Sequence, residues 1–312
     1  VSPDSHYLEL DQNEIDLLTA VTDGTFKRVV VVFNTPSSFE ATFLKDSAYA
    51  AFADKIDAAV WIGFTGSNGI TALGEILNGD VNPSGRLVDT YVHDNLSSAA
   101  MQNFGDYRYV NEDGSLSGYS YVNYAEGIYV GYKYYETRYE DAVMEQGNAS
   151  GNAGIFASKG DSWVYGEEVA YPFGYGMSYT TFEQALESVT YDAATDSFTV
   201  LVKVTNTGNV AGKEVVQVYG QQPYTEFDRA NAIEKASVQL VGFGKTNVLQ
   251  PGESETVSVT VDRKELTVYD EHVNKTYILE AGDYYLSVGL DAHDAVTVSY
   301  THLRAHETAA NL

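Results

Sequence analysis

Carboxylates are the side chains in this sequence with the clearest capacity for chemistry, because the 312 residues include 44 Asp and Glu and no Cys. Two carboxylates held close together can serve as a nucleophile and a general acid/base. Any two of the 44 could be nominated, so we assign no catalytic residue within the chain. The lack of Cys excludes a thiol nucleophile and a thiolate metal site. His, Ser and Asp occur without a nucleophile elbow or triad spacing.

Two His residues near the C-terminus form the only candidate metal pair. His302 and His306 stand at i and i+4, which would place both on one face of a helix. Only Glu307 lies nearby, and no motif for a third ligand follows. We therefore expect no metal site and no cofactor, and we predict that residues 299–312 are a non-native tail.

A Gly-rich segment from Gly63 to Asn68 could be mistaken for a phosphate-binding loop. It lacks both the Gly-Lys-Ser/Thr ending and the Rossmann glycine spacing, so it does not predict a nucleotide site. The formal net charge of −26 would repel a phosphate backbone, so we expect no nucleic-acid partner. No apolar run reaches about 18 residues, so we expect no membrane partner.

The start of the chain resembles neither a signal peptide nor a native N-terminus. VSPDSHYLEL has no basic region, no apolar region and no initiator Met. We expect it to lie inside a larger polypeptide. The location is unknown, and the missing signal peptide only slightly favours the cytoplasm.

The elements that would position any site fall into two kinds, and the first half of the chain mixes helix and strand. An amphipathic helix is predicted from Asp11, and a second helix is predicted at about Phe43–Asp54. The apolar runs Arg28–Asn34 and Ala58–Ile62 are predicted to be strands buried on both faces, as in a parallel sheet covered by helices. Helix and strand alternating at this spacing predict an α/β unit.

Further elements follow before the sequence changes character. A helix is predicted at Ile70–Leu77, with Asn78-Gly79 ending it. Asn82–Gly85 predicts a turn, and Arg86–Tyr91 predicts a strand. In Glu126–Asp141 apolar residues alternate with mixed ones, which predicts another strand.

From Leu186 onward only strand patterns occur. β-branched alternation broken by turn residues recurs in segments such as Ser197–Gly208 and Lys213–Pro223, which predicts a β-sandwich. The change follows the aromatic, Gly-containing stretch Tyr171–Glu183. We therefore predict two domains, residues 1–182 and residues 183–298.

Several strings resemble one family closely. Gly79–Leu87 reads GDVNPSGRL, Glu126–Thr137 reads EGIYVGYKYYET and Tyr171–Glu183 reads YPFGYGMSYTTFE. They are similar to motifs of glycoside hydrolase family 3, the β-glucosidase and β-xylosidase family. Val204–Tyr219 and Leu240–Ser254 resemble the fibronectin type III-like domain of the same family.

Details of the strings refine the resemblance. VNYAEG, together with Glu167-Glu168, is similar to the bacterial members that carry the sandwich domain ahead of the barrel. At Thr65–Asn68 the chain departs from the Pro-Gly-Gln-Glu that the family usually shows. No substrate contact can therefore be carried over to those positions.

The resemblance implies a fold and an activity for the parent protein. The fold would be α/β plus all-β: a front-truncated α/β sandwich domain with a mostly parallel sheet, then a fibronectin type III-like β-sandwich. The parent would hydrolyse terminal β-linked sugars with retention, acting on β-linked glucosides or short oligosaccharides in carbohydrate catabolism.

The resemblance also implies that this chain lacks the catalytic residues. The nucleophile Asp would lie on a (β/α)₈ barrel domain, which this chain lacks and would need as its partner. The acid/base Glu would lie in a Gly-Glu-Gly-like segment ahead of the helix near Asp11. We therefore expect the chain alone to be inactive, and its substrate-binding residues are unassigned. The alternative is a non-catalytic carbohydrate-binding or adhesion module; an open reading frame that continues upstream into such a segment would favour the enzyme.

Overall fold

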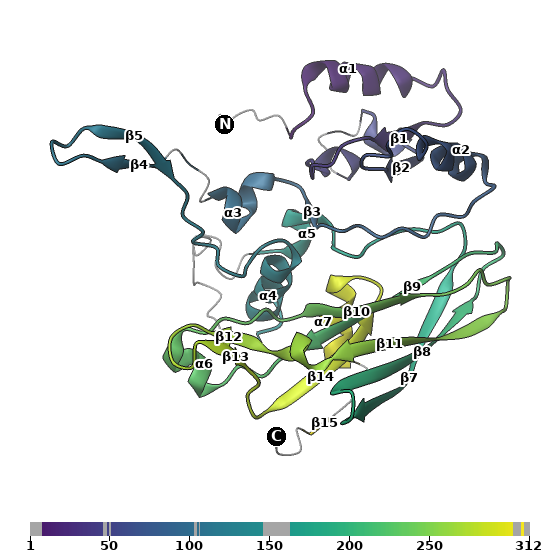
Figure 1. Ribbon diagram of the computed structural model, residues 1–312. Helices are drawn as coiled ribbons and strands as arrows, with labels where there is room; N and C mark the ends of the chain where they lie inside the picture. Colours follow the sequence, from purple (N-terminus) through teal and green to yellow (C-terminus); the bar gives the residue numbers. More distant parts are fainter. Residues whose placement is uncertain are drawn as a thin grey trace.

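The computed structural model describes residues 8–45, 49, 51–102, 105, 107–145, 163–301 and 307–308. Figure 1 shows short helices and strands of the first half lying over a β-sandwich formed by the second half. The predicted fold class, α/β followed by an all-β sandwich, is confirmed. The mostly parallel sheet expected in the first unit is wrong for the described residues, because one pair of strands there is parallel and two pairs are antiparallel.

The first helix forms where its capping residues predict it. α1 spans Gln12–Val21, and Asp11 and Glu14 form a reciprocal capping box at its start. The backbone N–H of Glu14 donates to Asp11 Oδ1 at 2.9 Å, and the N–H of Asp11 donates to Glu14 Oε2 at 2.8 Å. These bonds satisfy two backbone donors that the first turn of a helix otherwise leaves open.

The two apolar runs form a parallel pair of strands, as predicted. β1, Val30–Phe33, pairs with β2, Ala58–Trp61, from Val30↔Ala58 to Phe33↔Trp61. The prediction that both faces are buried is wrong, since Val30 is 40% exposed. Among the described residues no third strand joins the pair. Neither α1 nor α2 (Ile70–Asn78) contains a buried residue. The two helices therefore cover the faces of the β1–β2 pair only in part.

The helix predicted at Phe43–Asp54 is wrong over the described part of that range. Two 3₁₀ turns occur instead: η1, Thr42–Leu44, and η3, Ala53–Lys55. Phe43 and Phe52 are both buried at 2% exposure. In an α-helix, residues nine positions apart lie on opposite faces, because each residue turns the helix by about 100°. A continuous helix would therefore need packing partners on two opposite faces to bury both rings.

The segment after β2 is partly as predicted. α2 ends at Gly79, whose φ of 85° gives the left-handed cap. The strand predicted at Arg86–Tyr91 is wrong except for its last residue, because the chain there bonds to a turn. The Leu87 N–H donates to the Tyr175 carbonyl at 2.8 Å, and the Gly174 N–H donates to the Leu87 carbonyl at 2.8 Å. Only β3, Tyr91–Val92, is a strand, and it pairs with β6, Val169–Tyr171.

The strand predicted within Glu126–Asp141 is wrong, because α4 occupies Tyr132–Ala142. Gly131 precedes the helix with a φ of 57°, which ends the extended backbone. Tyr132, Tyr135 and Tyr139 recur at helical spacing and enter the hydrophobic clusters. The tyrosines fit the two-residue period of a strand as well as the 3.6-residue period of a helix. Packing of the rings in the hydrophobic clusters stabilises the helix.

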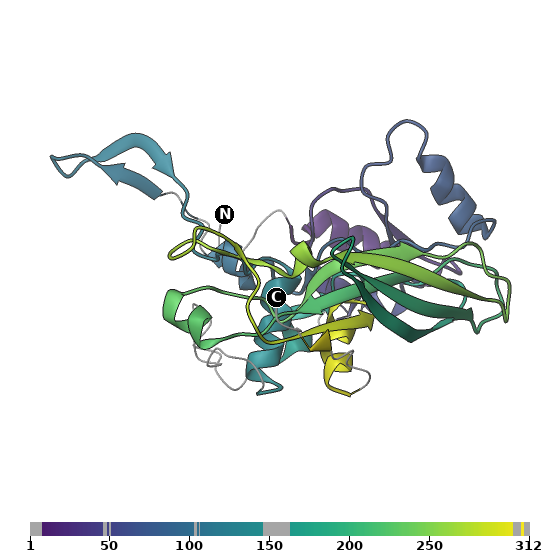
Figure 2. The same cartoon turned by 60° about the horizontal axis from the view of Figure 1, so that its bottom comes forward.

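A two-stranded hairpin stands away from the rest of the molecule (Figures 1 and 2). Its strands are β4, Tyr107–Val110, and β5, Leu116–Tyr121. We call this hairpin the arm. Three short helices complete the first unit: η4, Asn95–Ser97; α3, Ala99–Gln102; and α5, Tyr165–Glu168.

The β-sandwich carries the main core. One sheet has the order β11-β8-β7 and the other β10-β9-β14-β15. The strands span β7, Phe182–Asp192; β8, Ser197–Asn206; β9, Val215–Gln221; β10, Gln239–Lys245; β11, Ser254–Asp262; β14, Asp283–Gly289; and β15, Glu307–Thr308. Valines of β8, β9 and β11 fill the space between the sheets at 0–6% exposure.

Smaller elements complete the second half of the chain. They are α6, Glu226–Asn231; η6, Arg263–Leu266; β12, Val268–Asp270; β13, Thr276–Ile278; and α7, Ala292–Thr301. The boundary between residues 1–182 and 183–298 stays a prediction; β7 begins at Phe182. His302, His306 and most of 299–312 lie outside the described residues, so the predicted non-native tail is untested.

Candidate functional site

The carboxyl edge of β1 and β2 is the first candidate surface, because ligands of open parallel sheets bind outside the carboxyl ends of the strands. Trp61 ends β2, and its Nε1 donates to the Thr35 carbonyl at 2.9 Å. Gly63 has a φ of 54°, and a Cβ there would lie 3.3 Å from the Trp61 ring. Phe64 follows, 76% exposed. This edge therefore exposes the ring of Phe64. It supplies no catalytic carboxylate from residues 61–69, because that segment contains no Asp or Glu.

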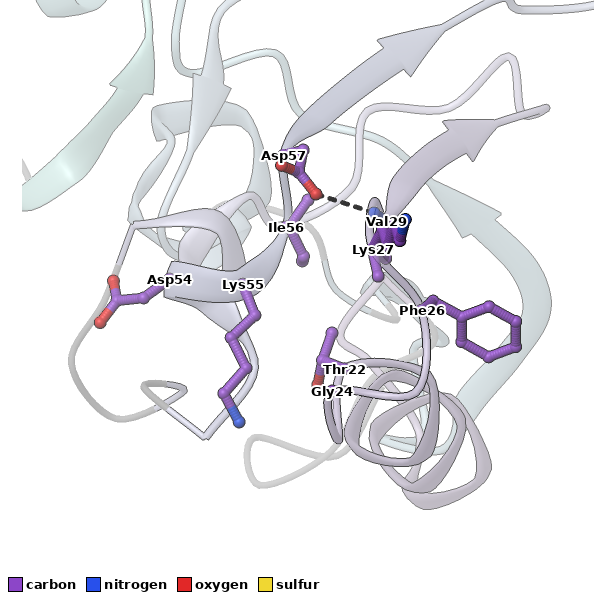
Figure 3. A pocket seen from close by; sticks show the side chains of 9 residues that line it. All are labelled: Thr22, Gly24, Phe26, Lys27, Val29, Asp54, Lys55, Ile56 and Asp57. Carbon is purple, nitrogen blue, oxygen red and sulfur yellow. Dashed lines mark hydrogen bonds between the residues drawn. The ribbon is translucent and has the colours of Figure 1, made fainter.

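A cavity of about 330 Å³ lies at the opposite, amino end of the same strands (Figure 3). There the Asp57 carboxylate accepts from the Val29 N–H at 2.8 Å and pairs with Arg28 at 2.5 Å. The Val29 bond, then the Arg28 bond, lowers the pKa of Asp57 below its ordinary value. In Figure 3 the side chains of Asp54 and Lys55 point away from that carboxylate. Asp57 therefore ties the starts of β1 and β2 together.

The motif Gly79–Leu87 holds the two units together. Asn82 Oδ1 accepts from Ser178 Oγ at 2.9 Å and from the Tyr179 N–H at 2.8 Å. Its Nδ2 donates to the Ala211 carbonyl at 3.0 Å. One amide thus joins the motif, the Tyr171–Glu183 stretch and the loop between β8 and β9.

A buried ion pair reinforces the same seam. The Arg86 guanidinium pairs with Glu214, and their side chains are only 13% and 4% exposed. Gln184 Nε2 also donates to Glu214 Oε1 at 3.2 Å. The motif Gly79–Leu87 therefore makes structural contacts in this chain.

Two other well-buried carboxylates, Glu140 and Asp270, also have structural partners. Glu140 accepts from Gln221 Nε2 at 2.9 Å. Asp270 accepts the N–H groups of residues 272–274 at 2.8–3.0 Å, and these bonds, led by that of Val273, lower its pKa to about 2. Such carboxylates organise loops and seams.

Glu136 lies at the centre of a titratable cluster inside the protein. It is fully buried on α4, and its Oε1 accepts from Tyr165 Oη at 2.5 Å. Its Oε2 lies 2.8 Å from Nδ1 of His293 on α7. The rings of Tyr165 and His293 stack with centroids 3.8 Å apart. The cluster thus joins α4 and α5 to the helix that follows the sandwich.

Burial controls the protonation of this cluster. It raises the pKa of Glu136 above its ordinary value, against the opposing influence of His293 and Tyr165. Burial, followed by the Glu136 charge, raises the pKa of Tyr165, and burial also raises the pKa of the neighbouring Asp291.

Replacing Glu136 by Gln is expected to stabilise the protein at neutral pH and to change little in acid. Because the folded-state pKa of Glu136 is raised, its contribution to stability is full below the ordinary Glu pKa and is lost as pH rises through the folded value. Gln keeps the shape and never ionises, so the variant should gain roughly 1 kcal/mol across that window.

Urea unfolding at several pH values measures this difference. The matched control is Glu112→Gln, at an exposed position in the turn of the arm. Its free energy of unfolding should vary with pH in the same way as that of the wild type. A Glu136→Gln profile that also stayed parallel to the wild type would refute the expectation.

A second buried charge cluster lies in the sandwich. Lys235 Nζ pairs with Asp228 Oδ2 at 2.7 Å and also with Glu280. Nζ donates a further bond to the Pro223 carbonyl at 2.8 Å. The side chains of Lys235, Asp228 and Glu280 are 5%, 0% and 11% exposed. The sequence did not predict this cluster, because no motif connects Asp228, Lys235 and Glu280.

No group of three or more His, Cys, Asp or Glu residues that could hold a metal ion occurs in the part of the chain that the structure describes. Among the described helices, none has the length and apolar character needed to span a bilayer.

Comparison with known families assigns both halves of the chain. Residues 2–132 match the glycosyl hydrolase family 3 C-terminal domain, and residues 214–292 match the fibronectin type III-like domain. The chain belongs to glycoside hydrolase family 3. The family resemblance of the sequence motifs is confirmed.

Relatives with similar sequences are much longer than this chain. It is 32% identical to β-glucosidase A of Butyrivibrio fibrisolvens, over 89% of this chain and 30% of the relative. It is 30% identical to the exo-α-(1→6)-L-arabinopyranosidase of Bifidobacterium longum, over 93% of this chain and 31% of that protein. This family 3 chain therefore spans about a third of the length of these relatives.

Solved structures agree with the fold. The β-glucosidase of Paenibacillus barengoltzii superposes with a TM-score of 0.69 at 31% identity, over 91% of this chain and 26% of that one. β-Glucosidase 3B of Thermotoga neapolitana, solved with glucose, gives 0.66 at 29% identity, over 98% of this chain and 35% of that one.

Proposed function

We propose that this chain is the non-catalytic part of a retaining glycosidase that removes terminal β-linked sugars. In this proposal a (β/α)₈ barrel domain carries the nucleophile, and the carboxyl edge of β1 and β2 shapes one side of the pocket. The acid/base Glu also lies outside this chain.

The observation that carries the proposal is the structural use of five buried carboxylates. A retaining glycosidase needs two carboxyl groups about 5–5.5 Å apart and facing the substrate. Glu136, Glu140, Glu214, Asp228 and Asp270 instead bond to side chains or backbone of this chain. The roughly threefold greater length of the relatives leaves room for a separate catalytic domain.

The sugar is a β-linked glucoside in this proposal, because several similar proteins are named β-glucosidases. The arabinopyranosidase of Bifidobacterium longum is similar to nearly the same degree. Both sugars are pyranoses, so the shared fold supports the class of sugar, and residues of the catalytic domain would select within it.

The chain alone is expected not to hydrolyse a nitrophenyl β-glucoside, because losing a catalytic carboxylate removes orders of magnitude in rate. The measurement is nitrophenol release by the purified chain. The product of the complete reading frame is the positive control. Turnover by the chain alone near 1 s⁻¹, an ordinary enzyme value, would refute the proposal.

A further inference from the structure

The arm contains tyrosine rings that pack against one another. Tyr107 and Tyr121 pair across the two strands, with ring centroids 5.6 Å apart and 31° between the planes. Tyr109 lies 5.0 Å from Tyr121, with 47° between the planes. Aromatic rings at these distances are in contact and stabilise each other. The hairpin therefore has a small apolar cluster of its own.

Hydrogen bonds in its turn also hold the arm in shape. The Asn111 N–H donates to the Ser115 carbonyl at 2.8 Å, and Asn111 Nδ2 donates to Ser115 Oγ at 2.9 Å. The Ser115 N–H donates to Asp113 Oδ1 at 2.9 Å. An isolated two-stranded hairpin is only marginally stable in water, so these bonds and the ring cluster both matter. A segment ordered in advance loses little conformational freedom when it docks.

Apolar side chains of the arm are nevertheless open to solvent. Tyr119, Val110, Leu116 and Tyr109 are 78%, 65%, 64% and 58% exposed, and Val122 directly after the arm is 69% exposed. We call these five residues the arm patch. Figures 1 and 2 show the arm standing clear of the sandwich and the helices. From the area that such side chains can bury, the arm patch exposes on the order of a few hundred Å², a size that often marks an interaction site.

The arm patch extends over both faces of the hairpin. Tyr109 contacts Tyr121, so its ring lies on the face of the tyrosine cluster. Val110 is the next residue of β4, and neighbouring residues of a strand point to opposite faces. Leu116 pairs with Val110 across the hairpin and shares its face. A flat surface could cover only one of these faces, whereas a groove covers both.

We propose that the arm inserts into an apolar groove on the catalytic domain of the same polypeptide. The identity of the partner rests on the proposed function, which places such a domain beside this chain. Because this chain spans about a third of the length of its relatives, most of their polypeptide lies outside the matched region. A domain tethered to the arm is present at high effective concentration, so a patch of this modest size is enough for docking.

Ring packing and charge favour this occupant over two others. The tyrosine rings contact one another at tilted angles, so they do not form a row of open faces for stacked sugars. The net charge of −26 repels a second copy of the chain. Glu112 and Asp113 place negative charge at the tip of the arm. We therefore expect a groove that is apolar along its length and basic where it meets the tip.

A second exposed hairpin in the same molecule supplies a matched control. Tyr277 of β13 is 70% exposed, close to the value for Tyr119. Its ring lies 5.2 Å from that of Tyr269 on β12, so it also contacts a neighbouring ring. The inference assigns no partner to this hairpin.

The test is nitration of tyrosine rings by tetranitromethane, located by mass spectrometry, in this chain and in the product of the complete reading frame. In this chain, Tyr109 and Tyr119 should react at rates similar to that of Tyr277. In the complete protein these two should react at least tenfold more slowly, and Tyr277 should be unchanged.

A substitution on the opposite face of the arm tests the groove. In the complete protein, Leu116→Ser should make Tyr109 react about tenfold faster, which corresponds to about 1.4 kcal/mol of docking free energy. In this chain alone, the same substitution should leave the rate of Tyr109 unchanged, which shows that the arm keeps its shape. Val273→Ser, at a 56% exposed position of the control hairpin, should change neither protein.

Three outcomes would overturn the inference. One is equal reaction of the arm tyrosines in both proteins, and another is a slowing of Tyr277 as large as theirs. The third is slowing in this chain alone as its concentration rises, which would assign the arm to a second copy. Nitration needs no turnover, so a complete protein that protects the arm but releases no nitrophenol contradicts only the proposed function. One that releases nitrophenol with an unprotected arm contradicts only this inference.

Discussion

Replacing Glu214 by Ala is expected to lower the free energy of unfolding by about 3–5 kcal/mol, because it leaves the Arg86 guanidinium buried without its partner. The Arg86 side chain is 13% exposed, so water can solvate it only in part. Its Nε is already buried without a hydrogen bond in the part of the chain that the structure describes. Urea unfolding of the purified chain measures the loss.

Two control variants separate the charge from the contact. Arg86→Met/Glu214→Leu removes both charges and keeps apolar volume, so it should recover most of the loss. Lys264→Ala breaks an ion pair with Asp262 whose side chains are 72% and 49% exposed, and it should cost less than 1 kcal/mol. A Glu214→Ala loss no larger than that of Lys264→Ala would contradict the expectation.

The sandwich could be predicted from the sequence because its signal is local. In β11 every second residue from Val257 to Val261 is buried, and strand pairing preserves that alternation. The helix α4 could not be predicted in the same way. Its tyrosines satisfy a period of two as well as a helical period, and the packing of Tyr135 and Glu136 decides between them.

The roles of individual polar residues were predictable only where partners are near in sequence. The capping box of Asp11 and Glu14 spans three positions and is visible in the chain. Asn82 and Arg86 bond to residues 96 and 128 positions away in the sequence. The motif that contains them therefore indicated the family but did not reveal which residues they contact. The Glu136 and Lys235 clusters are likewise built by the fold.

Replacing Lys235 by Met is expected to cost at least 3–5 kcal/mol at neutral pH, because it leaves two buried carboxylates facing each other without a cation. Asp228 is fully buried, and its Oδ1 has no hydrogen-bond partner among the described residues. Thr225 Oγ1 would still donate to Glu280 Oε1 at 2.5 Å, and the Thr225 N–H would still donate to Asp228 Oδ2 at 2.7 Å. These bonds supply no positive charge, so repulsion between the carboxylates remains.

A triple variant distinguishes uncompensated charge from lost packing. Adding Asp228→Asn and Glu280→Gln to Lys235→Met removes both carboxylate charges and should restore much of the stability. Urea unfolding of the wild type, Lys235→Met and the triple variant at neutral pH provides the measurement. If the added substitutions restored nothing, the loss would come from packing of the lysine stem and not from its charge.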